Sequence, residues 1–540
     1  MTWISSPILE KYPIVVVGGG PVGLGLAITL GLRGIACALI EPRTRLNRIP
    51  KGQNLTQRTL EHFASWGIEK ELRAARLMPK GYPIGELTAY GNLMSKYWHA
   101  PAGREVVRPF YSQDNERLPQ YQMERVLRER LATLPMVHTL FGWRAERIEQ
   151  DEETVRVSIH NEQGSGVRTL SCDYLVGCDG AHSLVRAQLG IERSKQDYEQ
   201  TMLLAVFRSS DLEERVKRFP MRSTYRVLRP ELRGFWQFFG RISVPDRWFF
   251  HAPVPSDSKI ETFGSLGLIR QAAGFPCACQ FEHLSFWNMR VAVAEKYQRG
   301  RVFIAGDAAH SHPPYGGFGL NNGLEDIVNL GWKLAARLQG WGTDALLQSY
   351  GIERRPIFWE TADDFITARI RRDADFLGRY SPERNVREFE TAWQARESDI
   401  GSRFQQYEPN YEGSPVVFGP PGGVTSAHGA HSFKARPGHH LAPAPLSDGN
   451  STFEALGSGF NLLAFDAPEQ SMVQFKGAAQ KLGIPLKFIP DSISGGREIH
   501  ESGLVLVRPD QYVAWVGEDA GAQAQQILRR VTGAGCARER

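Results

Sequence analysis

The sequence predicts an α/β fold, because a strand, a glycine-rich turn and a helix follow one another at three separate places in the chain. The strands of these units fall at residues 14–17, 172–178 and 301–305, and all three are apolar. Strands that alternate with helices are typical of a parallel sheet. We therefore expect a central α/β domain assembled from distant parts of the chain.

The glycines of the first unit have the spacing of a dinucleotide-binding turn. Gly18, Gly20 and Gly23 form the pattern G-x-G-x-x-G between a buried strand and a helix. The next apolar strand ends in Glu41, about 20 residues further on, where an acidic side chain binds a ribose. A plain strand–helix turn would explain the glycines but not Glu41. The unit therefore predicts a Rossmann-like dinucleotide site.

The third unit continues through residues 306–334 and has the densest loop chemistry in the chain. Asp307, two prolines and three glycines precede a helix. Prolines fix the backbone, glycines let amide N–H groups approach a ligand, and the helix adds its positive end. This loop suits the diphosphate and the electron-accepting ring edge of a large dinucleotide.

The second unit has Asp179 and Gly180 in its turn; by itself it is equally an ordinary turn capped by Ser183.

Taken together and in this order, the three units resemble the class A FAD-dependent aromatic hydroxylases, which are flavoprotein monooxygenases. Arg58 in the run RTLE and Gln120 in the run QYQME also match motifs of that family. The resemblance covers about residues 12–380. It implies FAD contacts from Gly18, Gly20, Pro21, Val22, Gly23, Glu41, Arg43, Gln120, Asp179, Gly180, Arg186, Gly306, Asp307, Pro314, Gly317, Gly319, Leu320 and Asn321.

The resemblance also implies a reaction. FAD would be reduced by NADH or NADPH, O2 would add at flavin C4a, and a hydroxyl group would pass to a phenol, a hydroxypyridine or another electron-rich ring. An epoxidase or a polyketide-tailoring monooxygenase is an alternative of the same cofactor class. A non-catalytic FAD-binding sensor is an alternative of a different class. Oxidation of NAD(P)H stimulated by a phenol would exclude the sensor.

Substrate contacts are expected from an aromatic-rich stretch at residues 190–290, whose alternating pattern predicts an antiparallel sheet. Most of these rings are expected to form the packed face of that sheet. The expected substrate contacts are Phe235, Trp236, Phe238, Arg226 and Pro313. The candidates for contact with the reacting hydroxyl are Tyr315, Tyr225, Gln53 and Asn54. Residues 51–54 lack the acidic side chain that the phenol hydroxylase branch has there.

The C-terminal region resembles the thioredoxin-like domain of the phenol hydroxylase and 3-(3-hydroxyphenyl)propionate hydroxylase branch. The resemblance rests on strands at 460–465 and 504–515 around a helix at 469–482, and no redox cysteine pair is present. The expected domains are an FAD-binding domain (1–85, 110–190 and 290–400), an interleaved antiparallel-sheet substrate domain (86–109 and 191–289), a linker (401–450) and the thioredoxin-like domain (451–540).

Composition indicates an ordinary multidomain enzyme. The 540 residues are 42% hydrophobic, and 64 Lys and Arg against 59 Asp and Glu give a net charge of +5. The two signs are interspersed, which argues against a nucleic-acid partner. No apolar run suggests a membrane span, and the six cysteines suggest neither a metal site nor disulfides. We expect a cytoplasmic homodimer that acts on a small aromatic molecule.

Overall fold

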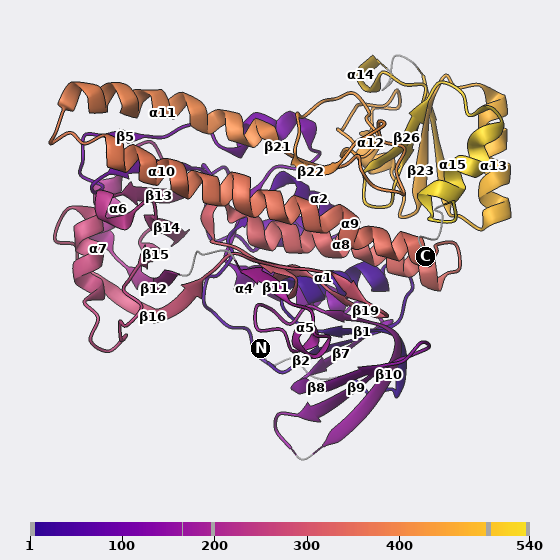
Figure 1. Cartoon of the computed structure of the whole chain (residues 1–540), viewed down its shortest axis with the longest axis horizontal. Coiled ribbons are helices and arrows are strands. Elements are labelled where there is room, and N and C mark those ends of the chain that lie inside the picture. Colours follow the sequence, from indigo (N-terminus) through magenta and orange to yellow (C-terminus); the bar gives the residue numbers. More distant parts are fainter. Residues whose placement is uncertain (1–5, 165, 196–199, 493–497, 536–540) are drawn as a thin grey trace.

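Three large sheets organise the chain, and long helices connect them (Figure 1). The computed structural model describes residues 6–164, 166–195, 200–492 and 498–535. The predicted fold class is confirmed: a Rossmann-like domain is interleaved with a second β-sheet domain and followed by a thioredoxin-like domain.

The eight-stranded sheet has a parallel centre, as its buried apolar strands require. Its order is β18-β19-β10-β1-β2-β7, and the hairpin strands β8 and β9 extend β10. The bounds are β1 Lys11–Val17, β2 Cys37–Glu41, β7 Val137–Phe141, β8 Trp143–Gln150, β9 Val155–Asn161, β10 Val167–Gly177, β18 Gln298–Arg299 and β19 Val302–Ile304. The helices beside it are α1 Pro21–Gly31, α2 Gln57–Ser65, α4 Gln120–Leu131 and α8 Phe318–Leu338.

The register of this sheet aligns the three motifs on one edge. Val17 pairs with both Ile40 and Gly177, and Gly177 pairs with Ile304. The turns that follow β1, β10 and β19 therefore emerge side by side, at the carboxyl ends of parallel strands. Open α/β sheets bind ligands at such an edge.

The seven-stranded sheet has the order β16-β12-β15-β14-β13-β4-β5. The strands from residues 200–289 pair antiparallel, as predicted for this stretch, and β4, from residues 86–90, adds to β13 in parallel. Residues 86–99 supply β4 and β5, a distant segment whose strand direction no local pattern sets. The bounds are β4 Glu86–Tyr90, β5 Trp98–His99, β12 Gln200–Arg208, β13 Thr224–Leu228, β14 Gln237–Ser243, β15 Arg247–Pro253 and β16 Gln280–Met289.

Helices cover both faces of the seven-stranded sheet, at the left of Figure 1. One face packs on α6 (Ser210–Val216) and α7 (Ser265–Ala273). The other face packs on α10 (Ala368–Arg379) and α11 (Val386–Gln406), where Phe389 and Trp393 are buried. Helix α10 and most of α11 fall in the range expected for the FAD domain, residues 290–400, yet their apolar residues pack on the second sheet.

The four-stranded sheet has the order β24-β23-β25-β26, with one parallel pair and two antiparallel pairs. Its strands are β23 Phe460–Phe465, β24 Leu486–Asp491, β25 Leu504–Val507 and β26 Val513–Gly517, and its main helices are α13 Glu469–Leu482 and α15 Ala524–Val531. Trp332 of α8 lies in the same apolar cluster as Phe460 and Leu506. The C-terminal domain therefore shares part of its core with the Rossmann-like domain.

The expected linker at 401–450 is corrected, because most of it is packed structure. Residues up to 406 complete α11, and β21 (Tyr407–Tyr411) pairs with β22 (Thr425–His428). Tyr411, Val417 and Ala427 are buried against α9 (Asp344–Glu360). The glycines and prolines of this stretch shape an irregular but buried connection. Within the described residues, every helix is too short or too polar to cross a membrane.

A buried ionic cluster fastens the C-terminal domain to helices α8 and α9. Glu353 of α9 accepts hydrogen bonds from Arg508 at 2.7 Å, from Lys333 at 2.6 Å and from Ser414 at 2.6 Å. Arg508 also pairs with Asp510 at 2.6 Å. The side chains of Lys333, Glu353, Arg508 and Asp510 are fully buried. Removing one charge from such a cluster leaves the others uncompensated in a medium of low polarity.

We expect Arg508→Met to lower the free energy of unfolding by about 3–5 kcal/mol, because Glu353 and Asp510 would lose their shared cation. Thermal melting of the purified chain measures the change. The matched control is Lys434→Met, which breaks the exposed pair between Lys434 and Glu501 and should cost less than about 1 kcal/mol. Equal shifts for the two variants would show that the buried cluster does not fasten the domains.

Candidate functional site

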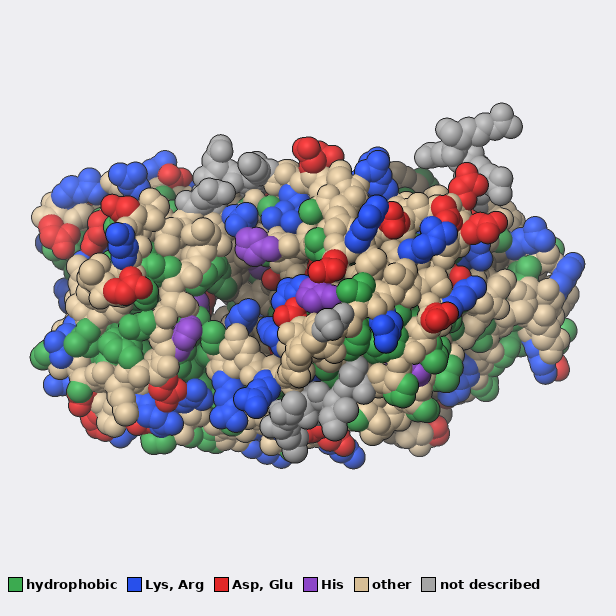
Figure 2. Space-filling view, turned by 90° about the horizontal axis from the view of Figure 1, so that it is seen from below, with side chains coloured by type: hydrophobic (Ala, Val, Ile, Leu, Met, Phe, Trp, Pro, Cys, Tyr) green, Lys and Arg blue, Asp and Glu red, His purple; other side chains and the backbone are tan. Residues whose placement is uncertain are grey.

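A cavity of about 1200 Å³ lies between the eight-stranded and seven-stranded sheets. Figure 2 shows the molecule hollowed on one face, with Lys, Arg and His side chains near the opening. The motif turns at the carboxyl edge of the eight-stranded sheet form one wall of the cavity. Strands β13 to β16 form another, and helix α8 begins beside it.

Most of the predicted site residues line this one cavity. Those predicted for the cofactor are Gly18, Gly20, Pro21, Val22, Glu41, Arg43, Gln120, Asp179, Gly180, Asp307, Pro314, Gly317, Gly319 and Leu320. Those predicted for substrate or catalysis are Gln53, Asn54, Arg226, Trp236, Phe238 and Tyr315. The fold thus brings together segments more than 250 residues apart in the chain.

Two helices begin at the cavity without a side-chain cap. Helix α1 follows Gly20, helix α8 follows Gly317, and neither N-cap residue makes a side-chain hydrogen bond to its helix. The first N–H groups of each helix are therefore available to a ligand, and the helix dipole favours an anion there. Gly317 needs its positive φ of 70° for this turn, a backbone conformation that favours glycine.

Three acidic side chains, Glu41, Asp179 and Asp307, lie in the motif segments that line the cavity. Glu41 accepts hydrogen bonds from the Gly19 N–H at 2.7 Å and from the Arg43 side chain at 2.8 Å, so its carboxylate is fixed at the ribose position that the motif predicts. Burial raises the pKa of Asp179 and the pKa of Asp307. One oxygen of Asp179, Oδ1, is buried without a partner among the described residues.

These features fit FAD. Two uncapped helix starts suit its diphosphate, Glu41 suits a ribose, and the free oxygen of Asp179 can accept a hydrogen bond from the cofactor. The space beside the Cα of Gly20 is open, since a Cβ there would meet no atom within 4 Å. A dinucleotide backbone can approach closely at that point.

Four predicted cofactor residues lie behind the cavity wall and support it instead. A Cβ on Gly23 would lie 1.9 Å from the Gly18 carbonyl oxygen, and one on Gly306 would lie 2.9 Å from Val22, so both glycines allow close packing. Arg186 donates a hydrogen bond to the Ala308 carbonyl at 2.7 Å. Asn321 accepts from Thr59 at 2.6 Å and donates to the Asn54 carbonyl at 2.9 Å. The Asn321 amide thus links helix α2 to residue 54, and Asn321 does not line the large cavity.

Three residues predicted for substrate or catalysis are also misplaced. Tyr225 precedes Arg226 on β13, so its side chain points to the opposite face of the sheet and packs near Trp248, with ring centroids 5.9 Å apart. Phe235 lies in the turn before β14 and packs against the apolar cluster that includes Trp236 and Phe238, but it does not itself line the cavity. Pro313 is buried and does not line the cavity.

The substrate end of the cavity is walled by a stacked group around Trp236. The Tyr315 ring stacks on the Trp236 ring with centroids 4.0 Å apart, and the backbone N–H of Trp236 donates to the Tyr315 hydroxyl at 3.3 Å. Arg226 lies 4.0 Å from the Trp236 ring and pairs with buried Asp373 at 3.1 Å. Burial raises the pKa of Tyr315. Tyr315 therefore stays protonated and can donate a hydrogen bond, and the charge of Arg226 is already neutralised.

Several cavity residues were not predicted from the sequence, among them His251, Arg104 and Arg117. His251 stacks on Phe238 at 5.0 Å, and its Nδ1 accepts from the Trp287 indole at 3.3 Å. Burial lowers the pKa of His251 to about 3, so the imidazole is neutral. His251 lies in the run RWFFHAP, where alternation on β15 was the one signal that could have placed it on the face of Phe249.

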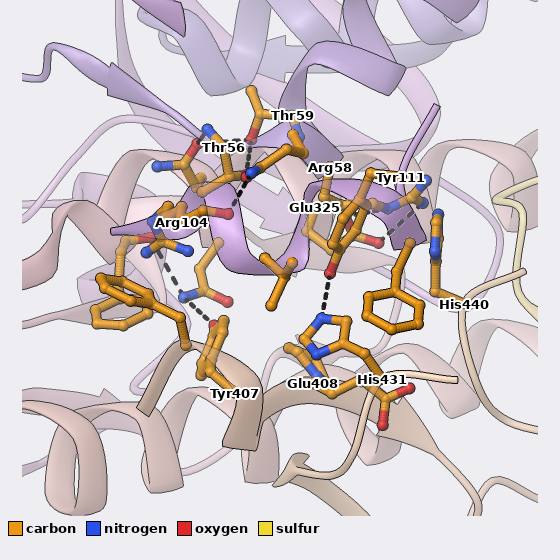
Figure 3. Close-up of a pocket in the computed structure, with 18 of the residues that line it drawn as sticks. Thr56, Arg58, Thr59, Arg104, Tyr111, Glu325, Tyr407, Glu408, His431 and His440 are labelled. Atoms are coloured by element: carbon orange, nitrogen blue, oxygen red, sulfur yellow. Dashed lines mark hydrogen bonds and ion pairs between the residues drawn. The ribbon is translucent and has the colours of Figure 1, made fainter. Parts of the chain in front are cut away.

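A second, smaller cavity of about 70 Å³ lies behind the first (Figure 3). Arg104 and Phe404 line both cavities. In Figure 3, Tyr111 and His431 point toward each other, and their hydrogen bond is 3.1 Å long. This space accommodates a few water molecules but no aromatic ring.

Comparisons with known proteins agree with this geometry. Residues 11–364 match the FAD binding domain family, and residues 434–535 match the family described as aromatic-ring hydroxylase, C-terminal. A 4-methyl-5-nitrocatechol 5-monooxygenase from a Burkholderia species is 31% identical, over 98% of this chain and 99% of that protein. A tetracenomycin A2 monooxygenase-dioxygenase from Streptomyces glaucescens is 29% identical, over 97% of each.

Solved structures show the same architecture. The flavin-dependent monooxygenase PieE, in complex with FAD and substrate, superposes on this chain with a TM-score of 0.85. The two sequences are 26% identical, and the superposition covers 98% of this chain and 100% of PieE. Because the FAD binding domain match spans well over half of the chain, the family is established. The chain belongs to the class A FAD-dependent aromatic hydroxylases, the flavoprotein monooxygenases.

Proposed function

We propose that this enzyme hydroxylates a phenolic or other electron-rich aromatic compound, using NADH or NADPH and O2. The observation that carries the proposal is the single cavity that joins the FAD motifs to the aromatic wall around Trp236 and Phe238. When bound, FAD supplies the two-electron chemistry and the activation of oxygen. The relative that acts on a nitrocatechol supports a phenolic substrate.

The residues of this chain would divide the work by position. The N–H groups at the starts of α1 and α8 would hold the diphosphate and the flavin ring edge, and Glu41 would hold the ribose. Trp236, Phe238 and Phe249 would pack on the substrate ring and exclude water from it. Tyr315 would donate a hydrogen bond to the substrate, since burial raises its pKa and keeps the hydroxyl protonated.

A polyketide-tailoring monooxygenase is the second candidate function. It is favoured by the tetracenomycin A2 monooxygenase-dioxygenase, which is similar over nearly its whole length. A homodimer and a cytoplasmic location also stay predictions.

A panel of phenols, hydroxypyridines and polycyclic aromatics tests both candidates. We expect the yellow purified protein to oxidise NADH or NADPH faster when a phenol is present, and mass spectrometry should find a product heavier by one oxygen atom. Stimulation only by polycyclic compounds would select the second candidate. Purified protein that stays colourless after incubation with FAD would contradict both.

Gly20→Ala should separate cofactor binding from folding. The new Cβ would meet no protein atom, so the unfolding free energy of the apoprotein should change by no more than about 1 kcal/mol. It would crowd the FAD backbone instead, and FAD affinity should fall by about tenfold or more. Fluorescence titration of the apoprotein with FAD measures this. The control Gly477→Ala also adds a Cβ in open space, on α13 far from the motif turns, and unaltered FAD affinity in both variants would contradict the placement of the cofactor.

Tyr315→Phe should lower kcat/KM for the best phenol by about tenfold and leave FAD content unchanged, because one hydrogen bond to the substrate is lost. Stopped-flow and product assays on the FAD-loaded enzyme measure both quantities. Tyr225→Phe is the matched control, since the same atom is removed from the opposite face of the sheet. If Tyr225→Phe impaired turnover as much as Tyr315→Phe, the cavity would not be the reaction site.

A further inference from the structure

The charged groups of the substrate end differ in whether an opposite charge accompanies them. Arg226 pairs with Asp373, and Glu86 pairs with Arg369. Arg104 and Arg117 line the same cavity, and neither makes an ion pair with a carboxylate within the part of the chain that the structure describes. Two guanidinium groups therefore face the cavity with their charge uncompensated.

Arg117 is held by neutral groups only. It is 3% exposed, its Nη2 donates to the Arg241 carbonyl at 2.9 Å, and its Nη1 donates to Asn54 Oδ1. Its guanidinium lies 6.0 Å from the ring centroid of Phe249. The nearest carboxylate in sequence, Glu116, accepts from the Arg117 backbone N–H at 3.0 Å and pairs with Arg73 at 3.3 Å, so among the described residues it makes no ion pair with the Arg117 guanidinium.

The Arg104 guanidinium is likewise surrounded by neutral groups. Its Nη2 donates to the Gly316 carbonyl at 3.1 Å, and its guanidinium lies 5.2 Å from the ring centroids of both Phe318 and Phe404. Burial lowers the pKa of the Arg104 guanidinium, and the hydroxyls of Tyr407 and Tyr111 oppose this shift. Burial also lowers the pKa of Arg117, where Tyr82 opposes the shift and Arg241 adds to it.

The two arginines donate hydrogen bonds to two segments of the chain that contact each other. Arg117 holds Asn54, and Arg104 holds Gly316. A Cβ on Gly317 would lie 3.3 Å from the Asn54 Cβ, so these two segments touch. Both cations therefore flank the place where helix α8 begins and where residues 51–54 carry no acidic side chain.

We propose that Arg104 and Arg117 form an anion-recognition site that binds the ring oxygen of the substrate as a phenolate. The proposal rests on the proposed function and narrows its substrate class to acidic phenols. A buried carboxylate would remove a proton from the phenol. An uncompensated pair of cations instead stabilises the phenolate directly, and the proton goes to solvent. The phenolate donates more electron density to its ring than the neutral phenol does.

The test uses oxidised, FAD-loaded enzyme and 4-nitrophenol, a phenol whose anion is coloured. Absorbance titration against pH gives the pKa of the bound probe. In the wild-type enzyme we expect this pKa to lie about 1–3 units below that of the free probe, the range caused by a cation within a few ångströms. Binding below the free pKa should also release a proton, which an indicator dye detects without any variant.

Arg104→Met and Arg117→Met should each raise the bound pKa by about one unit. Arg104→Lys and Arg117→Lys should recover part of the loss, because the charge remains. Arg208→Met is the matched control, since it removes an exposed cation that pairs with Asp246 outside the cavity. Flavin absorbance of each variant reports whether FAD is retained.

A bound pKa equal to that of the free probe overturns the proposal, as does an equal shift in Arg208→Met. Variants that change the flavin reduction potential and leave the bound pKa unaltered also overturn it, because the cations would then serve the reduced flavin. If phenols bind and stimulate turnover but keep their free pKa, the proposed function stands and the anion site fails. If no phenol binds or stimulates turnover, the proposed function itself fails.

Discussion

The cost of burying charge shapes this protein more than any other constraint. A charge taken out of water must find an opposite charge or several hydrogen bonds, or it destabilises the fold. The chain meets this requirement with clusters at its domain contacts: Glu353 with Arg508, Asp326 with Arg354, and Asp373 with Arg226. Against that background, the uncompensated cations of the cavity stand out. Groups whose charge costs stability without a partner are candidates for binding a charged ligand.

Local sequence patterns determined how much of the fold could be predicted. Strand β23 was predicted with its observed bounds, Phe460–Phe465, as was helix α13, Glu469–Leu482, because periodicity and turn residues are properties of neighbours in the chain. The interval 401–450 was misjudged for the converse reason. Glycine and proline are common both in free linkers and in packed irregular segments, and only the contacts of residues such as Tyr411 with α9 distinguish the two.

The residues of the candidate site also differ in whether a local pattern could place them. Gly18, Asp179 and Asp307 lie within three residues of the ends of β1, β10 and β19, so the parallel pairing of these strands places them close together. Residues on the second sheet depend on which face each strand turns to the cavity, and a shift of one residue inverts that choice. Tyr225 and Arg226 illustrate this. Both were predicted to contact the substrate, but they are neighbours on β13 and point to opposite faces, so only Arg226 lines the cavity. Arg104 lies outside any motif, so only the folded chain places it at the cavity.

The C-terminal domain contributes to the cavity although its sheet lies away from it and it has no redox cysteine pair. Arg58 of helix α2 donates to the Asp510 carbonyl at 2.6 Å and pairs with Glu325 of α8 at 3.1 Å. Helix α2 follows residues 53 and 54, which line the cavity. The loop that carries Asp510 therefore holds the helix that positions Asn54, and Asn54 in turn holds Arg117. The C-terminal domain thus supports the part of the cavity wall that contains Asn54 and Arg117, through buried polar and ionic contacts.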